Sequence, residues 1–424
     1  MKTGKTADAA IRTTSRYGRR GAMALVMGGV LLLTAACGDD KGGTGGGGDN
    51  AAPAATAGAG GTAAPAGASA EPKTSAAVLA VEPKDGAQDV APSNALQVSV
   101  SNGKLTTVEV TDKNGKPVDG AITPDGIGWK PAAALTVGMA YKVNAQAKDA
   151  DGLVAASTTT FTTLTPDKKV STNDNISDGA TYGVGMIVSV NFSKTVKNKD
   201  AVLKGITFET NNGTEVKGHW FGDNRLDFRP AEYWKPDTKV TIKYRLKSVE
   251  VAPGIYGDVD KDEPFTIGRS QIATADAKAH QMTIERGGKS TTVPVTMGAE
   301  ATPSWSGIMV IMSKEKVTRM NSQTVGLGGE YDIQDVPHAM RLTTSGTFVH
   351  GNYWSNATNP FGRTNASHGC VAMVDEKGGS DTSVAGKFFN DSMVGDVVKV
   401  VNSKEKTVAP SNGLGGWNVA WANW

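Results

Sequence analysis

Cysteine is almost absent from this chain of 424 residues, which has only two, at positions 37 and 370. Residues 76–268, in which short β-like runs dominate, contain neither of them. This absence excludes the disulfide that joins the two sheets of antibody domains. The two cysteines also differ in setting, because Cys37 follows an apolar segment and Cys370 lies among histidines.

The chain has little excess charge of either sign, with a formal net charge of +2. No strong electrostatic field follows from such a balance, so we expect no nucleic-acid partner. Histidine is also scarce, at five residues, and two of these lie within 20 residues of Cys370. Any site built on imidazole and thiol is therefore confined to one stretch of the chain.

Long apolar runs are missing apart from residues 22–36, which are too short to span a membrane permanently. Six basic residues precede this run, so residues 1–36 are typical of an export signal. Leu33-Thr34-Ala35-Ala36-Cys37 resembles a bacterial lipobox, with the leucine one place earlier than in the commonest form. The resemblance implies cleavage before Cys37 and lipidation of its thiol. The alternative is an ordinary secretory signal that is cleaved near the same place.

Residues 37–75 are rich in Gly, Ala, Thr and Pro and cannot form a core, so they predict a disordered linker. Its typical reach is roughly 35 Å. We therefore expect a protein anchored through lipid to the outer face of the cell membrane and reaching into the cell wall. If Cys37 carries lipid, Cys370 has no partner, and a lone exported thiol is better explained by reactivity than by structure.

Residues 76–165 alternate in short β-like runs separated by turn signals such as Asn102-Gly103 and Asp151-Gly152. This spacing predicts a β-sandwich of immunoglobulin-like type. Residues 166–268 repeat the plan, since Trp129-Lys130-Pro131 is echoed by Phe228-Arg229-Pro230. The sequence therefore predicts two tandem sandwiches, and their tryptophans, Trp129, Trp220 and Trp234, are expected to fill cores or the domain junction rather than to bind sugar.

Residues 346–371 hold the candidate chemistry. Residues 347–349 are typical of a short buried strand that ends at His350, and a polar loop then leads to Cys370. Acyl transfer by cysteine requires such a pair, because the thiolate attacks and a nearby imidazole takes its proton. Gly369 allows a tight turn whose N–H groups could hold an oxyanion. The alternative is a buried, inert cysteine near two surface histidines.

The same residues resemble the signature of the L,D-transpeptidase (YkuD) catalytic domain, which is His-Gly or His-Ser, a variable loop and Ser-His-Gly-Cys. His350-Gly351 and residues 367–370 match both halves of it. The resemblance is to the lipoprotein type with two immunoglobulin-like domains, found in high-GC Gram-positive bacteria. It implies a mainly β chain, with a catalytic domain at 269–402 and a tryptophan-rich extension at 403–424 that packs back on this domain.

One clear helix is expected in the catalytic domain, around Ser380 to Asn390, with Ser380 or Asp381 as its cap. A lid is expected between residues 318 and 345. Val325 and Ala372 depart from the Tyr and Asn of several relatives, and these departures concern substrate contacts rather than the chemistry.

The resemblance implies an enzyme that cross-links peptidoglycan. Cys370 would attack the third residue of a donor tetrapeptide stem, D-Ala would leave, and an amine of an acceptor stem would resolve the thioester into a 3→3 cross-link. His350 is the expected general base, oriented by the Gly351 carbonyl because the motif holds no carboxylate. The N–H groups of Gly369 and Cys370 are the expected oxyanion donors. We also expect a thiolate–imidazolium pair that lowers the pKa of Cys370.

Six further residues are expected to bind substrate. They are Met320, Tyr331, Asn352, Trp354, Ser367 and His368. Carbapenem β-lactams are expected as covalent inhibitors, and no cofactor is implied.

Three alternatives remain at the level of the sequence. Water could resolve the acyl-enzyme, which would give an L,D-carboxypeptidase, or the sandwiches could bind glycan or protein in a non-catalytic wall lipoprotein. Cys370, His350 and His368 could also supply three metal ligands, but the signature favours thiol catalysis. The other histidines, His219, His280 and His338, are expected to be structural or exposed.

Overall fold

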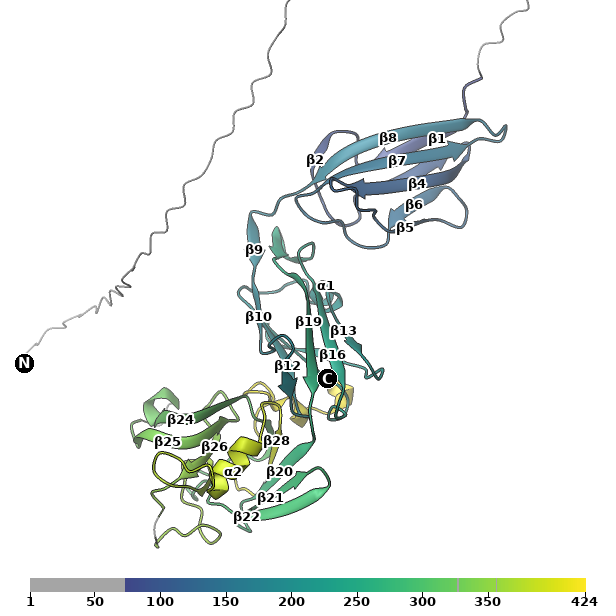
Figure 1. Ribbon diagram of the computed structural model, residues 1–424. Coiled ribbons are helices and arrows are strands. Elements are labelled where there is room, and N and C mark those ends of the chain that lie inside the picture. Colours follow the sequence, from purple (N-terminus) through teal and green to yellow (C-terminus); the bar gives the residue numbers. More distant parts are fainter. Residues whose placement is uncertain (1–72, 326–327, 356) are drawn as a thin grey trace, which may run out of the picture. The chain divides into compact units, whose positions relative to one another are not determined.

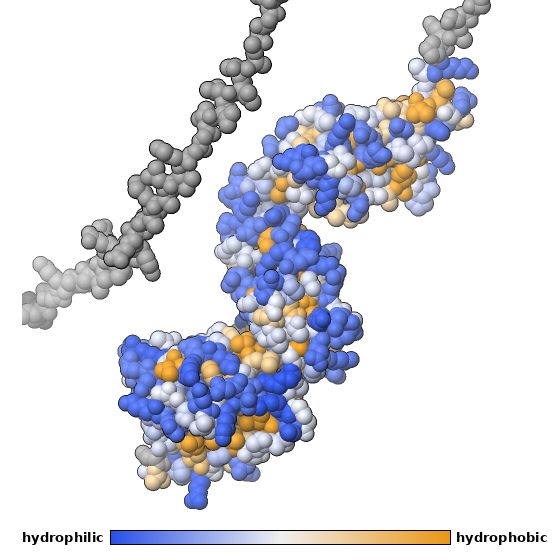
Figure 2. All heavy atoms as spheres, in the orientation of Figure 1, coloured by the Kyte–Doolittle hydropathy of each residue, from blue (hydrophilic) through white to orange (hydrophobic). Residues whose placement is uncertain are grey.

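Residues 73–325, 328–355 and 357–424 are described by the computed structural model, and they form a mainly β fold with immunoglobulin-like sandwiches before the catalytic domain, as the sequence predicted (Figure 1). The predicted signal segment, Cys37 and most of the linker lie outside these residues. Within them, no helix combines the length and the apolar character needed to cross a bilayer. Hydrophilic side chains cover most of the face in view, and hydrophobic residues gather only in small groups (Figure 2).

The first eight strands form two four-stranded sheets around one apolar core. They are β1 (Val78–Glu82), β2 (Ala87–Val90), β3 (Gln97–Ser101), β4 (Lys104–Asp112), β5 (Gly120–Ile122), β6 (Gly128–Pro131), β7 (Ala140–Lys148) and β8 (Val154–Thr163). The sheet orders are β1-β3-β6-β5 and β2-β8-β7-β4. Trp129, Val143 and Phe161 are buried between the sheets, so the alternating runs in the sequence place every second side chain in this core.

The second sandwich follows the same plan. Its elements are β9 (Lys168–Val170), β10 (Thr172–Asp174), β11 (Thr181–Tyr182), β12 (Val188–Phe192), α1 (Lys199–Lys204), β13 (Ile206–Thr210), β14 (Lys217–Phe221), β15 (Arg225–Arg229), β16 (Lys239–Arg245), β17 (Glu250–Ala252), β18 (Ile255–Gly257) and β19 (Asp260–Ile267). The orders β10-β12-β15-β14 and β11-β19-β16-β13 reproduce those of the first sandwich strand for strand. β17-β18-β9 is an added three-stranded sheet. The internal similarity seen in the sequence therefore reflects one repeated topology, and β6 and β15, which carry the echoed Trp129 and Phe228, are equivalent strands.

The catalytic domain is built from two sheets and one longer helix. Its elements are β20 (Gln271–Asp276), β21 (Gln281–Arg286), β22 (Lys289–Pro294), β23 (Gly307–Val310), β24 (Ser313–Asn321), η1 (Ser322–Val325), β25 (Asp332–Arg341), β26 (Phe348–Asn352), β27 (Val371–Val374), α2 (Val384–Asp391) and β28 (Val397–Val401), followed by η2 (Gly415–Asn418) and η3 (Trp421–Asn423). The sheets run β22-β21-β20-β28-β23 and β24-β25-β26-β27. Met309, Val349, Val371 and Val398 pack together, so residues of both sheets share one core.

Helix α2 begins later than the sequence predicted. Its cap is Ser383, whose hydroxyl accepts the N–H of Gly386 at 2.8 Å, and neither Ser380 nor Asp381 serves in this place. The N–H of Ser380 instead donates to the carboxylate of Asp375 at 3.0 Å. The backbone before Ser383 is thus used in a turn next to β27, and the helix can start only after it.

The C-terminal extension packs its tryptophans on the second sandwich. Arg229 of β15 lies 4.8, 5.4 and 4.3 Å from the ring centroids of Trp417, Trp421 and Trp424. Its guanidinium also donates to the Val419 carbonyl at 2.6 Å. A buried cation needs acceptors and aromatic faces in place of water, and the tail supplies both.

The same extension reaches the catalytic domain through Asn418, whose amide donates to the Ile308 carbonyl at 2.7 Å and accepts the Ile308 N–H at 2.8 Å. Val310 and Leu414 are also buried in the core of the second sandwich. The tail therefore packs on the catalytic domain as expected. It also packs on the second sandwich, which was not expected, because its three indoles lie against Arg229.

Candidate active site

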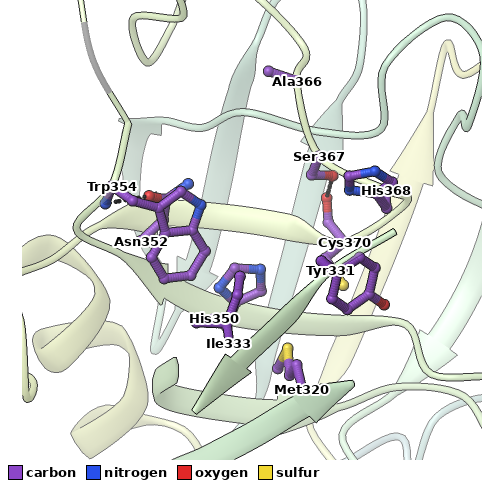
Figure 3. Close-up of a pocket in the computed structure, with 10 residues that line it drawn as sticks. All are labelled: Met320, Tyr331, Ile333, His350, Asn352, Trp354, Ala366, Ser367, His368 and Cys370. Carbon is purple, nitrogen blue, oxygen red and sulfur yellow. Dashed lines mark hydrogen bonds between the residues drawn. The ribbon is translucent and has the colours of Figure 1, made fainter. Parts of the chain in front are cut away.

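The strand order of the second catalytic sheet brings the imidazole of His350 and the thiol of Cys370 to one cavity. β26 and β27 are parallel neighbours, with His350 opposite Ala372, and Cys370 immediately precedes β27. Side chains from four stretches of the chain line the cavity (Figure 3). They are Met320, Tyr331, Ile333, His350, Asn352, Trp354, Ala366, Ser367, His368 and Cys370.

Eight of these ten residues were named from the sequence, and Ile333 and Ala366 were missed. Ile333 follows Tyr331 by two residues at the start of β25. Strand alternation would have placed the two side chains on one face of the lid. Most of the residues expected to form a lid, 318–345, belong to the paired strands β24 and β25.

His350 is held as a neutral base. Its Nδ1 is 2.7 Å from the Gly351 carbonyl, which can only accept, so this nitrogen carries the proton and Nε2 keeps a free lone pair. The imidazole stacks on the indole of Trp354 with 5.8 Å between ring centroids. Burial lowers the pKa of His350, against the opposing effects of the Gly351 carbonyl and the Asp375 charge. The Gly351 carbonyl therefore orients the ring as the sequence suggested.

The thiol of Cys370 is not ionised in this structure, and here the sequence-based expectation was wrong. Burial raises the pKa of Cys370 to about 11, although the Phe348 backbone and Arg341 act in the opposite direction. The Sγ atom donates to the Gly346 carbonyl at 3.8 Å. A desolvated thiol and a desolvated imidazole are both stabilised in their neutral forms, so the ion pair is not the resting state.

The loop that carries the thiol is closed by Ser367. Its hydroxyl donates to the Cys370 carbonyl at 2.6 Å and accepts the Gly369 N–H at 3.2 Å. Gly369 has φ of +110°, a conformation that L side chains rarely adopt, while an added Cβ would meet nothing closer than 3.9 Å. Glycine is thus required at position 369 by the positive φ angle of its backbone and not by a lack of room for a side chain. The Gly369 N–H, one of the two expected oxyanion donors, is engaged within the loop.

His368 and Tyr331 form the wall between this cavity and a second one. Their rings lie 5.0 Å apart, and His368 Nε2 is 3.3 Å from a carboxylate oxygen of Glu330. Both residues line the second cavity, together with Gly346 and Gly369. Burial, and then the nearby Cys370 and Glu330, raise the pKa of Tyr331, so its hydroxyl is a donor at neutral pH.

Comparison with known proteins assigns the family. Residues 270–400 match the family described as the L,D-transpeptidase catalytic domain, and residues 87–250 match the family described as the bacterial Ig domain. L,D-transpeptidase 2 of Mycobacterium tuberculosis (strain CDC 1551 / Oshkosh) is 32% identical over 357 residues, which are 83% of this chain and 84% of that protein. This chain belongs to the L,D-transpeptidase family. L,D-transpeptidase 5 of Mycobacterium tuberculosis (strain ATCC 25618 / H37Rv) is 26% identical over 82% of this chain and 76% of its own length.

Among solved structures, an L,D-transpeptidase in complex with imipenem is 29% identical to this chain. The alignment covers 56% of this chain and 100% of the solved chain, with a TM-score of 0.46.

In this L,D-transpeptidase, some of the remaining predicted residues line the cavity and others support the residues that line it. The Asn352 side-chain oxygen accepts the N–H groups of Trp354 and Ser355, both at 2.9 Å, and so fixes the turn that places the indole over His350. Met320 packs with Phe348 and Cys370. Ala372 is fully buried opposite His350 and does not line the cavity, and the side chain of Val325 lies outside the described part of the chain.

One histidine of the transpeptidase is not where the sequence placed it. His338 was expected at the surface but is completely buried, with Nδ1 2.7 Å from a carboxylate oxygen of Asp375. No local pattern predicts this contact, because the partner lies 37 residues away in sequence. Of the other two histidines, His280 is half-buried against Asn365, and His219 stacks on Trp424.

Metal binding has no geometric support in the described residues of this transpeptidase, where no group of three His, Cys, Asp or Glu side chains is placed to hold an ion. Cys370, His350 and His368 share the cavity as separate groups, since His368 faces Glu330 and His350 faces Gly351.

Proposed function

We propose that this enzyme forms 3→3 cross-links in peptidoglycan through a thioester on Cys370. The observation that carries the proposal is one cavity lined by the Cys370 thiol and by a His350 imidazole with a free Nε2. Family membership supports the reaction class, and the chemistry of these two groups supports the roles within it.

In the first half-reaction, His350 Nε2 accepts the proton of the Cys370 thiol as Sγ attacks the carbonyl carbon of the third residue of a donor stem. The S–C bond forms, the C–N bond to D-Ala breaks, and His350 returns the proton to the leaving amine. Because thiol and imidazole are both neutral at rest, the ion pair forms only during this step. The Cys370 N–H and the Tyr331 hydroxyl are the donors we assign to the oxyanion.

In the second half-reaction, the side-chain amine of an acceptor stem attacks the thioester. The new C–N bond forms, the C–S bond breaks, and His350 carries the amine proton back to Sγ. Desolvation favours this return, since burial stabilises the neutral thiol. A carbapenem would form a thioester of the same kind: Sγ attacks the carbonyl of the strained β-lactam amide, the ring C–N bond breaks, and His350 gives the proton to the ring nitrogen.

Purified disaccharide-tetrapeptides test the proposal directly. Incubation with the enzyme should release D-Ala and yield cross-linked dimers, identified as 3→3 by tandem mass spectrometry, while Cys370→Ala should yield none. Disaccharide-tripeptides without dimers would show that water is the acceptor, and the enzyme would then be an L,D-carboxypeptidase. Unchanged tetrapeptides would favour the non-catalytic wall lipoprotein.

We further propose that the chain is a lipoprotein on the outer face of the cell membrane, anchored through Cys37. The support is the apolar run at 22–36 that ends before this cysteine. Cys37→Ala should move the protein from the detergent phase to the aqueous phase in a partition assay, because acyl chains provide the membrane affinity. Cys370→Ala, which removes the other cysteine, should leave the partition unchanged. A wild-type protein that is already aqueous would rule out the anchor.

A further inference from the structure

A buried carboxylate, Asp375, lies directly behind the turn that orients the base. It follows β27 and is 7% exposed, and its side chain is fully buried. One carboxylate oxygen is 2.7 Å from His338 Nδ1, and the other accepts the N–H groups of Glu376 at 2.8 Å and Ser380 at 3.0 Å. The Asp375 N–H donates to the Asn352 carbonyl at 3.2 Å, which ties this residue to the end of β26.

The carboxylate occupies the space that a side chain at position 351 would need. An ideal Cβ built on Gly351 would lie 2.1 Å from a carboxylate oxygen of Asp375, far inside any real contact distance. The φ angle of Gly351 is not in the left-handed region, so its backbone would accept an L residue. Glycine is therefore required at 351 by Asp375, and the acidic side chain touches the peptide whose carbonyl accepts from His350.

Asp375 remains an acceptor-only, negatively charged group. Burial alone would raise its pKa, but hydrogen bonds from His338, Ser380, Glu376 and Ser383 outweigh burial and lower it. His338 is held against it on the opposite side, and its Nε2 is 3.5 Å from Asp381. Phe389 packs against the His338 ring, so water is kept from this pair.

We propose that Asp375 is a positioning residue for His350, a buried carboxylate behind Gly351 that stabilises the imidazolium formed when His350 takes the proton of Cys370. This inference rests on the proposed role of His350 as the base. The imidazolium must form where burial opposes it, and the Gly351 carbonyl supplies only a partial charge to offset that cost. The Asp375 charge acts through the Gly351 peptide, and His338 fixes where that charge lies.

If Asp375 had a purely structural role, removing its charge while keeping its shape would leave the pKa of His350 unchanged. Asp375→Asn keeps the shape and the oxygen that accepts from Glu376 and Ser380. Its amide can donate to His338 Nδ1 once the His338 proton moves to Nε2, which faces Asp381. The turn should therefore survive in Asp375→Asn while the negative charge is lost.

The direct readout is the titration of the His350 imidazole by NMR in a Cys370→Ala background, where no thiol titrates. Asp375→Asn should lower the pKa of His350 by about 1, since it removes a nearby opposite charge. In the chain with Cys370 intact, acylation by imipenem at pH 7 should slow about tenfold. The matched control is Asp381→Asn, which removes the exposed carboxylate on the far side of His338 and should leave the His350 titration unchanged.

Gly351→Ala provides a second variant that retains the charge. Its methyl group must displace the Asp375 carboxylate, so the pKa of His350 should again fall. An unchanged His350 pKa in both variants, or an equal fall in Asp381→Asn, would overturn the inference. Because this titration is read without catalysis, it is independent of the proposed function, which fails if the wild-type enzyme makes neither an imipenem adduct nor cross-links.

Discussion

Cys370→Ser is expected to abolish acylation by imipenem. The substitution exchanges one atom in a buried site, and the cavity around it keeps its other lining residues. A hydroxyl ionises far less easily than a thiol, and burial already raises the thiol pKa to about 11. His350 would then have to remove a proton from a group too weakly acidic for it. The measurement is the intact mass of the protein after incubation with the carbapenem.

The control for Cys370→Ser is to show that the variant is folded. Near-ultraviolet circular dichroism can show this, because tryptophans lie in every domain and in the C-terminal extension. A folded variant that still gains the mass of the carbapenem would contradict the role of the thiol. Peptide mapping would then locate the residue that carries the adduct, and Ser367, the other hydroxyl of the motif, would be the first candidate.

His350→Ala should reduce the rate of acylation by a factor of about 10²–10⁴, the usual contribution of a general base. The pKa of His350 is lowered by burial, so the wild-type base is neutral at pH 7 and the rate should vary little from pH 7 to 9. Without the base, attack depends on the small fraction of free thiolate. That fraction rises about tenfold per pH unit below the thiol pKa, so the residual rate should rise in the same way.

A pH series of adduct formation therefore distinguishes His350→Ala from the wild type in two ways: by the size of the rate and by its slope against pH. His219→Ala is the matched control, because His219 lies on β14 of the second sandwich, stacks on Trp424 and does not line the cavity. Its rate and slope should equal those of the wild type. An unchanged rate in His350→Ala at neutral pH would transfer the role of base to His368, which lines the same cavity.

Local patterns in the sequence were sufficient for most of the fold. Period-two runs and Gly-containing turns predicted several strands of the first sandwich, because alternation records directly which side of a strand is buried. Internal similarity then predicted the second sandwich. The apolar run after Cys370 coincides with β27. The start of α2 was misplaced because the backbone of Ser380 is already bound by Asp375, a contact that helix signals do not encode.

The reactive pair was also within reach of the sequence. The spacing of His350-Gly351 and residues 367–370 identified the thiol, the imidazole and the carbonyl that orients the imidazole. All three groups belong to one strand and the loop that follows it, so a short motif contains them. The lid residues Met320 and Tyr331 were found through the resemblance to the family, and Ile333 was missed although strand alternation could have found it.

Only the tertiary structure decided the electrostatics of the site. Protonation depends on the summed effects of burial, hydrogen bonds and charges from segments that are distant in sequence, and no short motif contains that sum. The motif predicted a thiolate at Cys370, whereas burial leaves a neutral thiol. In the same way, nothing in the sequence around His338 indicates a partner for its imidazole, so it was expected at the surface. The packing of β25 against β26 and α2 instead buries it against Asp375 and places a carboxylate behind the catalytic turn.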